Sequence, residues 1–272
     1  IIEDYPGRRL ASSSRRPYDG ARIRAEGRGV KTPVREARTR RTTWPRALAS
    51  AALDLLFPPR CVACGRGGSF LCAVCLTHAT PVPEPRCSLC GQPIAGGPLC
   101  SRCAESPVAG SGLRSVFVYA GPVQAAVRAL KYHNMRVVAS PLGVEMARYL
   151  QAWGVGLDIV VPVPLHPRRL RERGYNQAEL LARALGKETG LSVQPEALAR
   201  VRDTPAQARA PSAAERRRNV TGAFSAREVV RGRRALLVDD VCTTGATLSA
   251  CAEALLAAGA AQVWGLTVAR EP

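Results

Sequence analysis

The chain has 272 residues, of which 46% are hydrophobic, and this length and composition exclude a wholly disordered protein and allow one or two domains with a buried core. Its 39 Lys and Arg residues outnumber 21 Asp and Glu residues, so the formal net charge is +18 at pH 7. Such a balance favours anionic partners, whether nucleotides, nucleic acid or a lipid surface, and says nothing about the fold.

Residues 1–46 are predicted to form a disordered basic tail. They hold thirteen Arg or Lys against five Asp or Glu and almost no apolar periodicity, so they bury too little surface to offset their ordering entropy. A basic arm for nucleic acid is the functional alternative. The tail lacks the apolar core of a secretory signal, and the apolar stretch after it, Ala47 to Phe57, is far shorter than the roughly 20 residues that span a bilayer. We therefore expect a short helix there, no transmembrane segment and a cytoplasmic protein.

Eight of the ten cysteines form Cys-x-x-Cys pairs, namely Cys61/Cys64, Cys72/Cys75, Cys87/Cys90 and Cys100/Cys103. One pair offers two thiolates from a tight turn, and two pairs complete a tetrahedral set that suits Zn²⁺. Pairing in sequence order predicts two structural zinc ribbons within residues 47–107, while an interleaved pairing fits the same spacing. Disulfides and an iron–sulfur cluster are the alternatives, and the lack of an export signal argues against disulfides. Gly65 and Gly91 follow two of the pairs, where sharp turns are expected.

From residue 108 to 272 the chain alternates strand-like and helix-like segments. We expect strands at 115–120, 158–163, 235–238 and 262–269. Helices are expected at 123–132, from Ser140-Pro141 onward, at 175–189 before Gly190, and at 248–258. This alternation predicts an α/β domain with an open, mostly parallel sheet and ligands at the carboxyl ends of its strands.

The second of these strands runs into a proline-rich turn, Pro162-Val163-Pro164-Leu165-His166-Pro167, followed by arginines at 168, 169, 171 and 173. Proline cannot continue the hydrogen-bonding ladder, so we expect the chain to leave the sheet here with a stiff backbone. The arginines would then lie over the crevice at the edge of the sheet. An ordinary solvated basic face is the alternative.

Residues 200–224 are rich in arginine and show no packing pattern before Ser212 and Glu215, which form a capping box that opens a short basic helix. We expect a mobile segment. Beside a phosphate site, such a segment could close over a departing anion, exclude water and neutralise charge. A plain surface loop is the alternative.

The most informative segment is residues 235–248. The apolar run Ala235 to Val238 reads as a central parallel strand, which Asp239 and Asp240 follow. Hydroxyl residues and a glycine then lead into a helix, so free backbone N–H groups meet at an anion site. Because carboxylates suit ribose hydroxyls and the turn suits phosphate, the segment points to a phosphorylated ribose. A strand ending in two solvated aspartates is the alternative.

This segment resembles the phosphoribosyl diphosphate (PRPP) loop of type I phosphoribosyltransferases. The resemblance implies that Asp239 and Asp240 bind the ribose hydroxyls and that the following turn binds the 5′-phosphate, through Thr243, Thr244, Gly245, Ala246 and Thr247. It also implies a diphosphate loop, comprising Pro162, Val163, Pro164, Leu165, His166 and Arg168. A flexible loop would contribute Arg202, Thr204, Gln207, Arg216 and Asn219.

Taken together, the motifs resemble the ComF family over about residues 50 to 270. They are the paired Cys-x-x-Cys knuckles, Ala-Leu-Lys-Tyr at 129–132, the Pro-Val-Pro-Leu-His-Pro segment with its arginines, the Thr-Pro-x-Gln segment, and Val-Asp-Asp-Val-x-Thr-Thr-Gly-Ala-Thr. The family joins a double zinc ribbon to a type I phosphoribosyltransferase domain and is linked to natural competence, the import of single-stranded DNA. The long basic N-terminus and Pro211 depart from the pattern.

The resemblance implies binding of Mg²⁺-PRPP and transfer by displacement at the anomeric carbon. Two alternatives belong to other classes: a sensor of PRPP or a nucleotide without turnover, and a single-stranded DNA-binding protein that works with other competence proteins. No residue stands out as a general base, and no acceptor can be predicted. Lys131 is expected to be solvated, and its position in the family offers a phosphate contact as the alternative. Cys242 is expected to fill a tight loop, with a redox role as the alternative.

Overall fold

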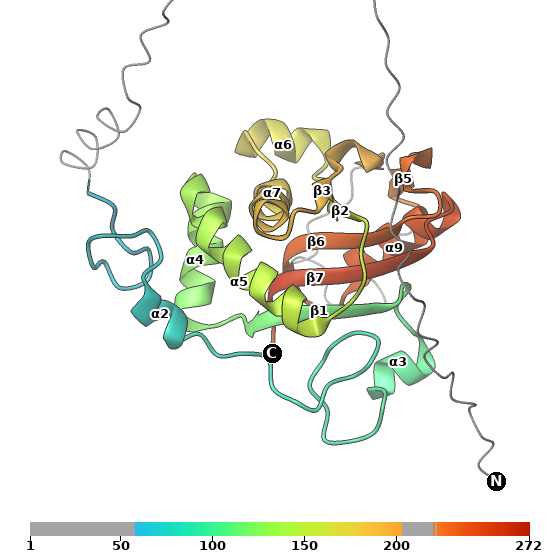
Figure 1. Ribbon diagram of the computed structural model, residues 1–272, viewed down its shortest axis with the longest axis horizontal. Helices are drawn as coiled ribbons and strands as arrows, with labels where there is room; N and C mark the ends of the chain where they lie inside the picture. Colours follow the sequence, from blue (N-terminus) through green and yellow to red (C-terminus); the bar gives the residue numbers. More distant parts are fainter. Residues whose placement is uncertain (1–57, 203–219, 221) are drawn as a thin grey trace, which may run out of the picture. The chain divides into compact units, whose positions relative to one another are not determined.

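The computed structural model describes residues 58–202, 220 and 222–272, which belong to one compact unit that begins at residue 47 (Figure 1). The predicted tail at 1–46 and the helix expected at 47–57 lie outside the described residues. No helix in the described part of the chain combines the length and apolar character that crossing a bilayer requires.

Within the described residues, five parallel strands form the central sheet in the order β1-β7-β6-β2-β3. The strands are β1 (Gly112–Val118), β2 (Ile159–Pro162), β3 (Ser192–Val193), β6 (Arg234–Cys242) and β7 (Gln262–Arg270). This confirms the predicted α/β class with a parallel sheet. The last strand in the chain, β7, is not at an edge of the sheet but lies between β1 and β6.

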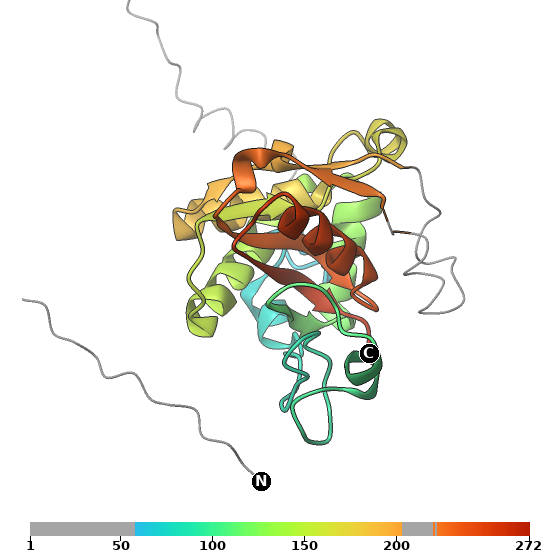
Figure 2. The same ribbon diagram turned by 90° about the vertical axis from the view of Figure 1, so that its right-hand side faces the viewer.

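Helices cover both faces of the sheet (Figure 2). They are α4 (Gly121–Tyr132), α5 (Ala139–Trp153) and α7 (Gln177–Thr189) on one face, and α9 (Ala246–Ala257) on the other. Strand alternation divides the core: Leu236 and Val238 of β6 pack in the cluster that contains Leu130 of α4, whereas Leu237 packs in the cluster that contains Leu255 of α9. The strand β6 is therefore buried on both sides.

All four predicted helix starts differ from the structure by one or two residues, and α4 and α9 begin two residues earlier than predicted. The helix α5 continues from a 3₁₀ turn, η1 (Arg136–Val138), so Ser140-Pro141 lies inside its first turn and Val138 occupies the cap position. The helix α7 begins at Gln177, because the Asn176 side chain accepts a hydrogen bond from the Ala178 N–H and caps it. Its predicted end at Gly190 is confirmed by the left-handed conformation there (φ 74°).

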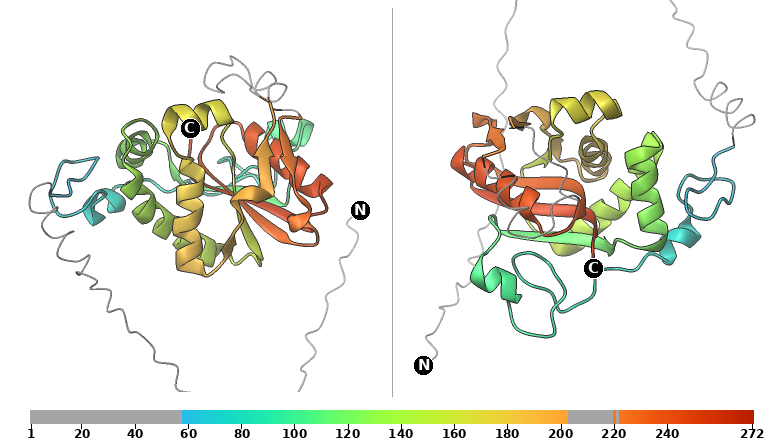
Figure 3. Two further views of the ribbon diagram at one scale, coloured as in Figure 1. Left: turned by 90° about the horizontal axis from the view of Figure 1, so that it is seen from above. Right: turned by 180° about the vertical axis from the view of Figure 1, so that it is seen from behind.

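Smaller elements complete the structure. They are α2 (Ala73–Thr77), α3 (Ser101–Glu105), α6 (Pro167–Arg173), the antiparallel pair β4 (Leu198–Arg200) and β5 (Phe224–Ala226), and the 3₁₀ turns η2 (Pro195–Ala197) and η4 (Glu228–Val230). Figure 3 shows α2 beside α4, and α3 near β1. The two predicted zinc-ribbon segments thus meet the sheet domain at different places.

Candidate functional site

Two adjacent carboxylates lie near the carboxyl end of the central strand β6. The strand does not end at Val238 as predicted: Asp239 pairs with Thr267 of β7, and the ladder continues to Cys242. Because successive side chains of a strand point to opposite faces, the two carboxylates face different layers. Asp240 is 3% exposed on the face of α4, whereas Asp239 is only partly buried.

Asp240 forms an ion pair with Lys131 at the end of α4. The Lys131 Nζ lies 3.0 Å from Asp240 Oδ1, and the two side chains are 20% and 4% exposed. Burial lowers the pKa of Lys131, but the charges of Asp240 and Asp239 outweigh it and raise this pKa above its usual value. The expectation of a solvated lysine is therefore wrong. The other carboxylate oxygen of Asp240, Oδ2, is buried without a hydrogen-bond partner among the described residues, so it can accept one from a ligand or bind a cation.

Asp239 is held in an environment that disfavours its charged form. Burial and then the neighbouring charge of Asp240 raise the pKa of Asp239 to about 7, and Lys131 only partly offsets this. Its carboxylate also accepts a hydrogen bond of 2.8 Å from the Asp240 N–H. A bound cation or hydrogen-bond donor would relieve the repulsion between the two acids, so the pair is suited to a ligand that brings either.

This raised pKa predicts a pH-dependent stability. The unfolded carboxyl has a pKa of 3.8, so between about pH 4 and pH 7 the folded state binds more protons and loses stability as the pH rises. We expect Asp239→Asn to raise the free energy of unfolding at pH 8, by up to about 4 kcal/mol, and to change it little at pH 4. Denaturant unfolding at both pH values measures this.

Asp158 provides the control, because its pKa is shifted in the opposite direction to that of Asp239. Hydrogen bonds from Arg234 lower the pKa of Asp158 to about 2, so Asp158→Asn should lower stability at pH 8. If Asp239→Asn were also less stable than wild type at pH 8, the raised pKa of Asp239 would be refuted.

A hydroxyl-rich turn joins β6 to α9. Gly245 adopts a left-handed conformation (φ 80°) at the cap position, and a Cβ atom there would lie 3.1 Å from Leu113 Cδ2, so the turn needs glycine. The Thr244 hydroxyl accepts a 3.3 Å hydrogen bond from the Ala246 N–H. Thr243, Thr244 and Thr247 are all partly exposed, so hydroxyl groups and the positive end of the α9 dipole surround one point.

The proline-rich turn lies beside the acid pair, because β2 is the neighbour of β6. Pro162 still pairs with Val238, and the Val163 N–H donates to the Val238 carbonyl at 2.9 Å, so the ladder ends at the start of the proline-rich turn, as predicted. Proline is tolerated there because β3 has already ended on its other side. Pro162 and Val163 are buried, and Pro164 and Leu165 are partly exposed.

The arginines after this turn form a helix, α6, that the sequence analysis missed. His166 caps it, since its Nδ1 accepts a 3.4 Å hydrogen bond from the Arg168 N–H, Pro167 occupies its first turn, and Gly174 ends it with a φ of 78°. Arg168 is exposed and pairs with Glu172 at 3.1 Å. Part of the basic cluster is thus a solvated helix face, as the alternative proposed.

Of the predicted flexible-loop residues, only Arg202 is described, and it is exposed just after β4. Thr204, Gln207, Arg216 and Asn219 lie outside the described residues, as does the predicted capping box. The antiparallel pair β4–β5 brackets this segment and packs beside α9. The described residues on either side of this segment therefore lie near the helix that carries the hydroxyl-rich turn.

The eight paired cysteines form two sets of four within the described residues, Cys61, Cys64, Cys72 and Cys75, and Cys87, Cys90, Cys100 and Cys103. The sulfurs of Cys61 and Cys75 lie 3.6 Å apart, and those of Cys90 and Cys100 lie 3.7 Å apart. Tetrahedral zinc with bonds of about 2.3 Å separates its sulfurs by about 3.8 Å, whereas a disulfide bond is about 2.05 Å long. The sequential pairing is confirmed, and both sets fit a zinc ion.

The second ribbon contacts the sheet and the hydroxyl-rich turn directly. The Leu113 N–H at the start of β1 donates to the Leu89 carbonyl at 2.7 Å. Arg270, at the end of β7, is 4% exposed and donates both to the Cys90 carbonyl and to the Thr243 carbonyl, the latter at 3.4 Å. Arg270 was not predicted, and its only signal is a charged residue ending an apolar strand.

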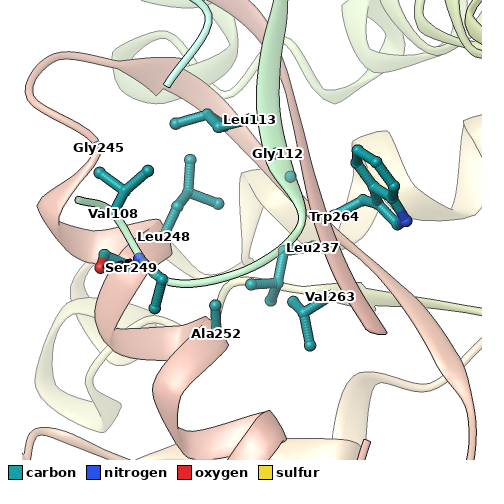
Figure 4. Close-up of a pocket in the computed structure, with 12 residues that line it drawn as sticks. Val108, Gly112, Leu113, Leu237, Gly245, Leu248, Ser249, Ala252, Val263 and Trp264 are labelled. Carbon is teal, nitrogen blue, oxygen red and sulfur yellow. Dashed lines mark hydrogen bonds between the residues drawn. The ribbon is translucent and has the colours of Figure 1, made fainter. Parts of the chain in front are cut away.

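A small apolar cavity of about 10 Å³ lies between α9 and the segment that leads from the second ribbon into β1 (Figure 4). Val108, Leu113 and Leu248 line it, and it has room for one water molecule at most. Nearby, the Ala109 N–H donates to the Ser249 hydroxyl at 2.9 Å. This contact is packing that fixes the ribbon's connection onto α9, and not a ligand site.

Comparison with known families divides the chain into the same two parts. Residues 52–104 match the double zinc ribbon domain, and residues 171–272 match the phosphoribosyl transferase domain. The first match assigns zinc to the two cysteine sets. The second covers the end of α6, the acid pair and the hydroxyl-rich turn.

Three curated relatives cover most of the described chain. DNA utilization protein YhgH of Escherichia coli is 37% identical over 204 residues, which are 72% of this chain and 89% of that protein. Competence protein F of Haemophilus influenzae is 30% identical over 76% of this chain and 96% of its own. Competence protein ComFC of Bacillus subtilis is 26% identical over 74% and 84%.

Among solved structures, the chain is similar to glutamine PRPP amidotransferase from B. subtilis complexed with ADP and GMP. The identity is 23% and the TM-score 0.37, over 52% of this chain and 30% of that one. UMP synthase of Leishmania donovani gives 18% identity and a TM-score of 0.32, over 50% and 24% of the two chains.

Proposed function

The chain belongs to the ComF family, and we propose that it binds Mg²⁺-PRPP at the carboxyl ends of β6 and β2, transfers the phosphoribosyl group to an acceptor, and serves DNA uptake in natural transformation. In this proposal residues 47–107 form the zinc-ribbon part, and residues 108–272 form the transferase domain. The thiolate sets require a reducing compartment, so we propose a cytoplasmic location.

One observation carries the proposal: the acid pair, the hydroxyl-rich turn and the proline-rich turn meet at one edge of the sheet on adjacent strands. Acids suit the hydroxyls of a ribose, a helix start preceded by hydroxyls suits its 5′-phosphate, and a stiff turn on the next strand suits the diphosphate. The groups that suit the ribose, the 5′-phosphate and the diphosphate of PRPP thus lie at the ends of two adjacent strands, β6 and β2.

We assign roles to the side chains accordingly. Asp239, the more exposed acid, accepts hydrogen bonds from the ribose hydroxyls, and Asp240 contributes its unpaired Oδ2. Thr243 to Thr247 hold the 5′-phosphate, and residues 162–168 hold the diphosphate, over which the segment around Arg202 closes. When bound, Mg²⁺ would offset the diphosphate charge, and the raised pKa of Asp239 fits a carboxylate that needs a cation nearby.

Calorimetric titration of the zinc-loaded chain with PRPP and Mg²⁺ tests the proposal. We expect saturable one-site binding by the wild type and at least a tenfold loss in Asp239→Asn/Asp240→Asn, because the hydroxyls lose charged hydrogen-bond acceptors. Asp158→Asn, an acid-to-amide change at the start of β2, is the matched control and should bind normally. Failure of folded wild type to bind would refute both the transferase and the PRPP-sensor function.

One surface favours the single-stranded DNA alternative. Tyr132 is 68% exposed, with the Arg173 guanidinium 5.8 Å from its ring centroid, so it offers an aromatic face and a cation to a base and its phosphate. Titration of the same proteins with a labelled oligonucleotide separates DNA binding from PRPP binding. DNA binding that weakens steeply with salt and survives the acid-pair substitution would favour this role over the sugar-phosphate one. A sensor would bind PRPP without releasing diphosphate.

A further inference from the structure

The two cysteine sets differ in how far they are exposed to solvent. In the second set every cysteine is buried, with an exposed fraction of 8% or less. In the first set Cys61, Cys72 and Cys75 are equally buried, but Cys64 is exposed. Of the ten cysteines, all of which lie within the described residues, only Cys64 is open to a reagent in solution.

The difference has a structural cause, because Cys64 and Cys90 occupy the same position in the repeated unit. Each precedes a glycine with a positive φ, 74° at Gly65 and 68° at Gly91. The turn at Gly91 lies against β1, where a Cβ atom would overlap the Leu113 carbonyl oxygen, and Cys90 is 0% exposed. A Cβ atom at Gly65 would meet no atom of the described residues within 4 Å. The loop before α2 lies at the margin of the domain (Figure 1), so the turn at Cys64 is left uncovered.

Cys64 also lies next to a second sulfur with which it can form a disulfide. Its Sγ atom is 3.7 Å from the Sγ atom of Cys72 in the same set. Thiols that coordinate zinc are deprotonated, so both sulfurs are then thiolates, the form that reacts with peroxides. Oxidation favours an exposed thiolate with a second thiol beside it, and Cys64 meets both conditions. The second set is buried, and Arg102 donates to Cys90 Sγ at 3.9 Å, which withdraws charge from that sulfur.

We propose that Cys64 is an oxidation site, at which hydrogen peroxide converts the first ribbon to a zinc-free form with a disulfide between Cys64 and Cys72, while the second ribbon keeps its zinc. This inference does not depend on PRPP binding. A lone pair of the Cys64 thiolate forms a bond to a peroxide oxygen as the O–O bond breaks, which gives a sulfenic acid. The Cys72 thiolate then attacks the Cys64 sulfur, and the S–O bond breaks. Each step releases one hydroxide ion, which takes a proton from the solvent.

The two thiolates thus lose two electrons, and the peroxide is reduced to two molecules of water. The two sulfurs that remain, those of Cys61 and Cys75, do not complete a tetrahedral set, so Zn²⁺ dissociates. Both cysteines belong to the core cluster that contains Val127 and Leu130 of α4. Oxidation should therefore loosen α2 from α4 and leave the sheet and the second ribbon folded, and a thiol reductant with added zinc should reverse the change.

Peroxide treatment of the full, zinc-loaded chain in the presence of a colorimetric zinc chelator tests the inference. We expect one zinc ion per chain to be released at least about tenfold faster than the other. Trypsin cleaves after Arg60, Arg66 and Arg86, so a disulfide between Cys64 and Cys72 joins peptide 61–66 to peptide 67–86. Mass spectrometry of the joined peptides, with fragmentation, locates the bond.

Cys64→His keeps a zinc ligand, as in sites with three cysteines and one histidine, but has no sulfur to oxidise at that position. It should bind two zinc ions and retain both at the peroxide concentration that removes one from the wild type. Cys251→Ala, which removes a buried thiol of α9 outside both sets, is the matched control and should release one zinc ion as the wild type does.

Release of both zinc ions at equal rates, or a first disulfide that does not include Cys64, overturns the inference. So does retention of both ions up to the peroxide concentration at which the sheet domain unfolds. If Cys64→His does not bind two zinc ions, the joined peptides of the wild type decide alone. PRPP titration of the oxidised chain is not needed for this result, so failure of the proposed function leaves it unchanged.

Discussion

Lys131→Met is expected to lower the free energy of unfolding at pH 8 by about 3 kcal/mol, the lower end of the range for breaking a buried ion pair. The change leaves the Asp240 carboxylate, 4% exposed, without the ammonium group that lies 3.0 Å away. It also removes a cation that opposes the raised pKa of Asp239. Without that ammonium group the pKa of Asp239 rises further, so PRPP affinity at pH 7 should fall together with stability.

Lys187→Met is the matched control, because Lys187 lies in the last turn of α7 as Lys131 lies in the last turn of α4, yet it is exposed. Its effect should stay within about 0.5 kcal/mol, as for surface substitutions in general. Lys131→Met/Asp240→Asn should recover most of the lost stability, since neither partner is then a buried unpaired charge. Denaturant unfolding of the wild type, Lys131→Met, Asp240→Asn and the double variant gives the coupling energy, and a double variant as unstable as Lys131→Met would refute a stabilising ion pair.

The sequence predicted the sheet well, because its strands are apolar on both faces and the helices between them have regular apolar spacing. Continuous apolar runs are typical of central parallel strands, and the chain has two of them, Ile159 to Val161 and Leu236 to Val238. The missed elements are short: β4 and β5 have three residues each, too few for a pattern to stand out. The sequence contains the residues that cap helix α6, His166, Pro167 and Gly174. Its arginines were nevertheless interpreted as part of a ligand-binding loop.

For the site, the sequence predicted which types of residue take part, but it did not predict which of those residues contact one another. The cysteine spacing was enough to predict both metal sets, because ligands so close in sequence restrict the geometry. The contacts of Lys131 with Asp240 and of Arg270 with Cys90 join residues 109 and 180 positions apart, and nothing local in the sequence encodes them. The same holds for Arg102, which lies between two zinc ligands and had no predicted role.

Loss of the zinc ion from the second ribbon is the other change with a large expected effect on PRPP binding, because of where this ribbon lies. Arg270 connects the Cys90 carbonyl to the Thr243 carbonyl, so one side chain joins a zinc knuckle to the hydroxyl-rich turn. Gly91 adds a close approach, because a Cβ atom there would lie 2.4 Å from the Leu113 carbonyl oxygen. The first ribbon packs elsewhere, with Cys61 and Cys75 in the core cluster that also holds helix α4. The two zinc ions should therefore differ in their effect on PRPP.

Cys100→Ser and Cys72→Ser form a matched pair, since each removes the third ligand of its set and each cysteine precedes a short helix, α3 or α2. Each variant should lose one of two zinc ions by metal analysis. We expect Cys100→Ser to weaken PRPP binding at least tenfold, because an unfolded second ribbon releases Arg270 and the turn that it holds, while Cys72→Ser stays within about threefold. Thermal unfolding must show that the sheet domain remains folded in both. Equal losses of affinity would mean that the contact between Arg270 and Cys90 does not link zinc to the ligand site.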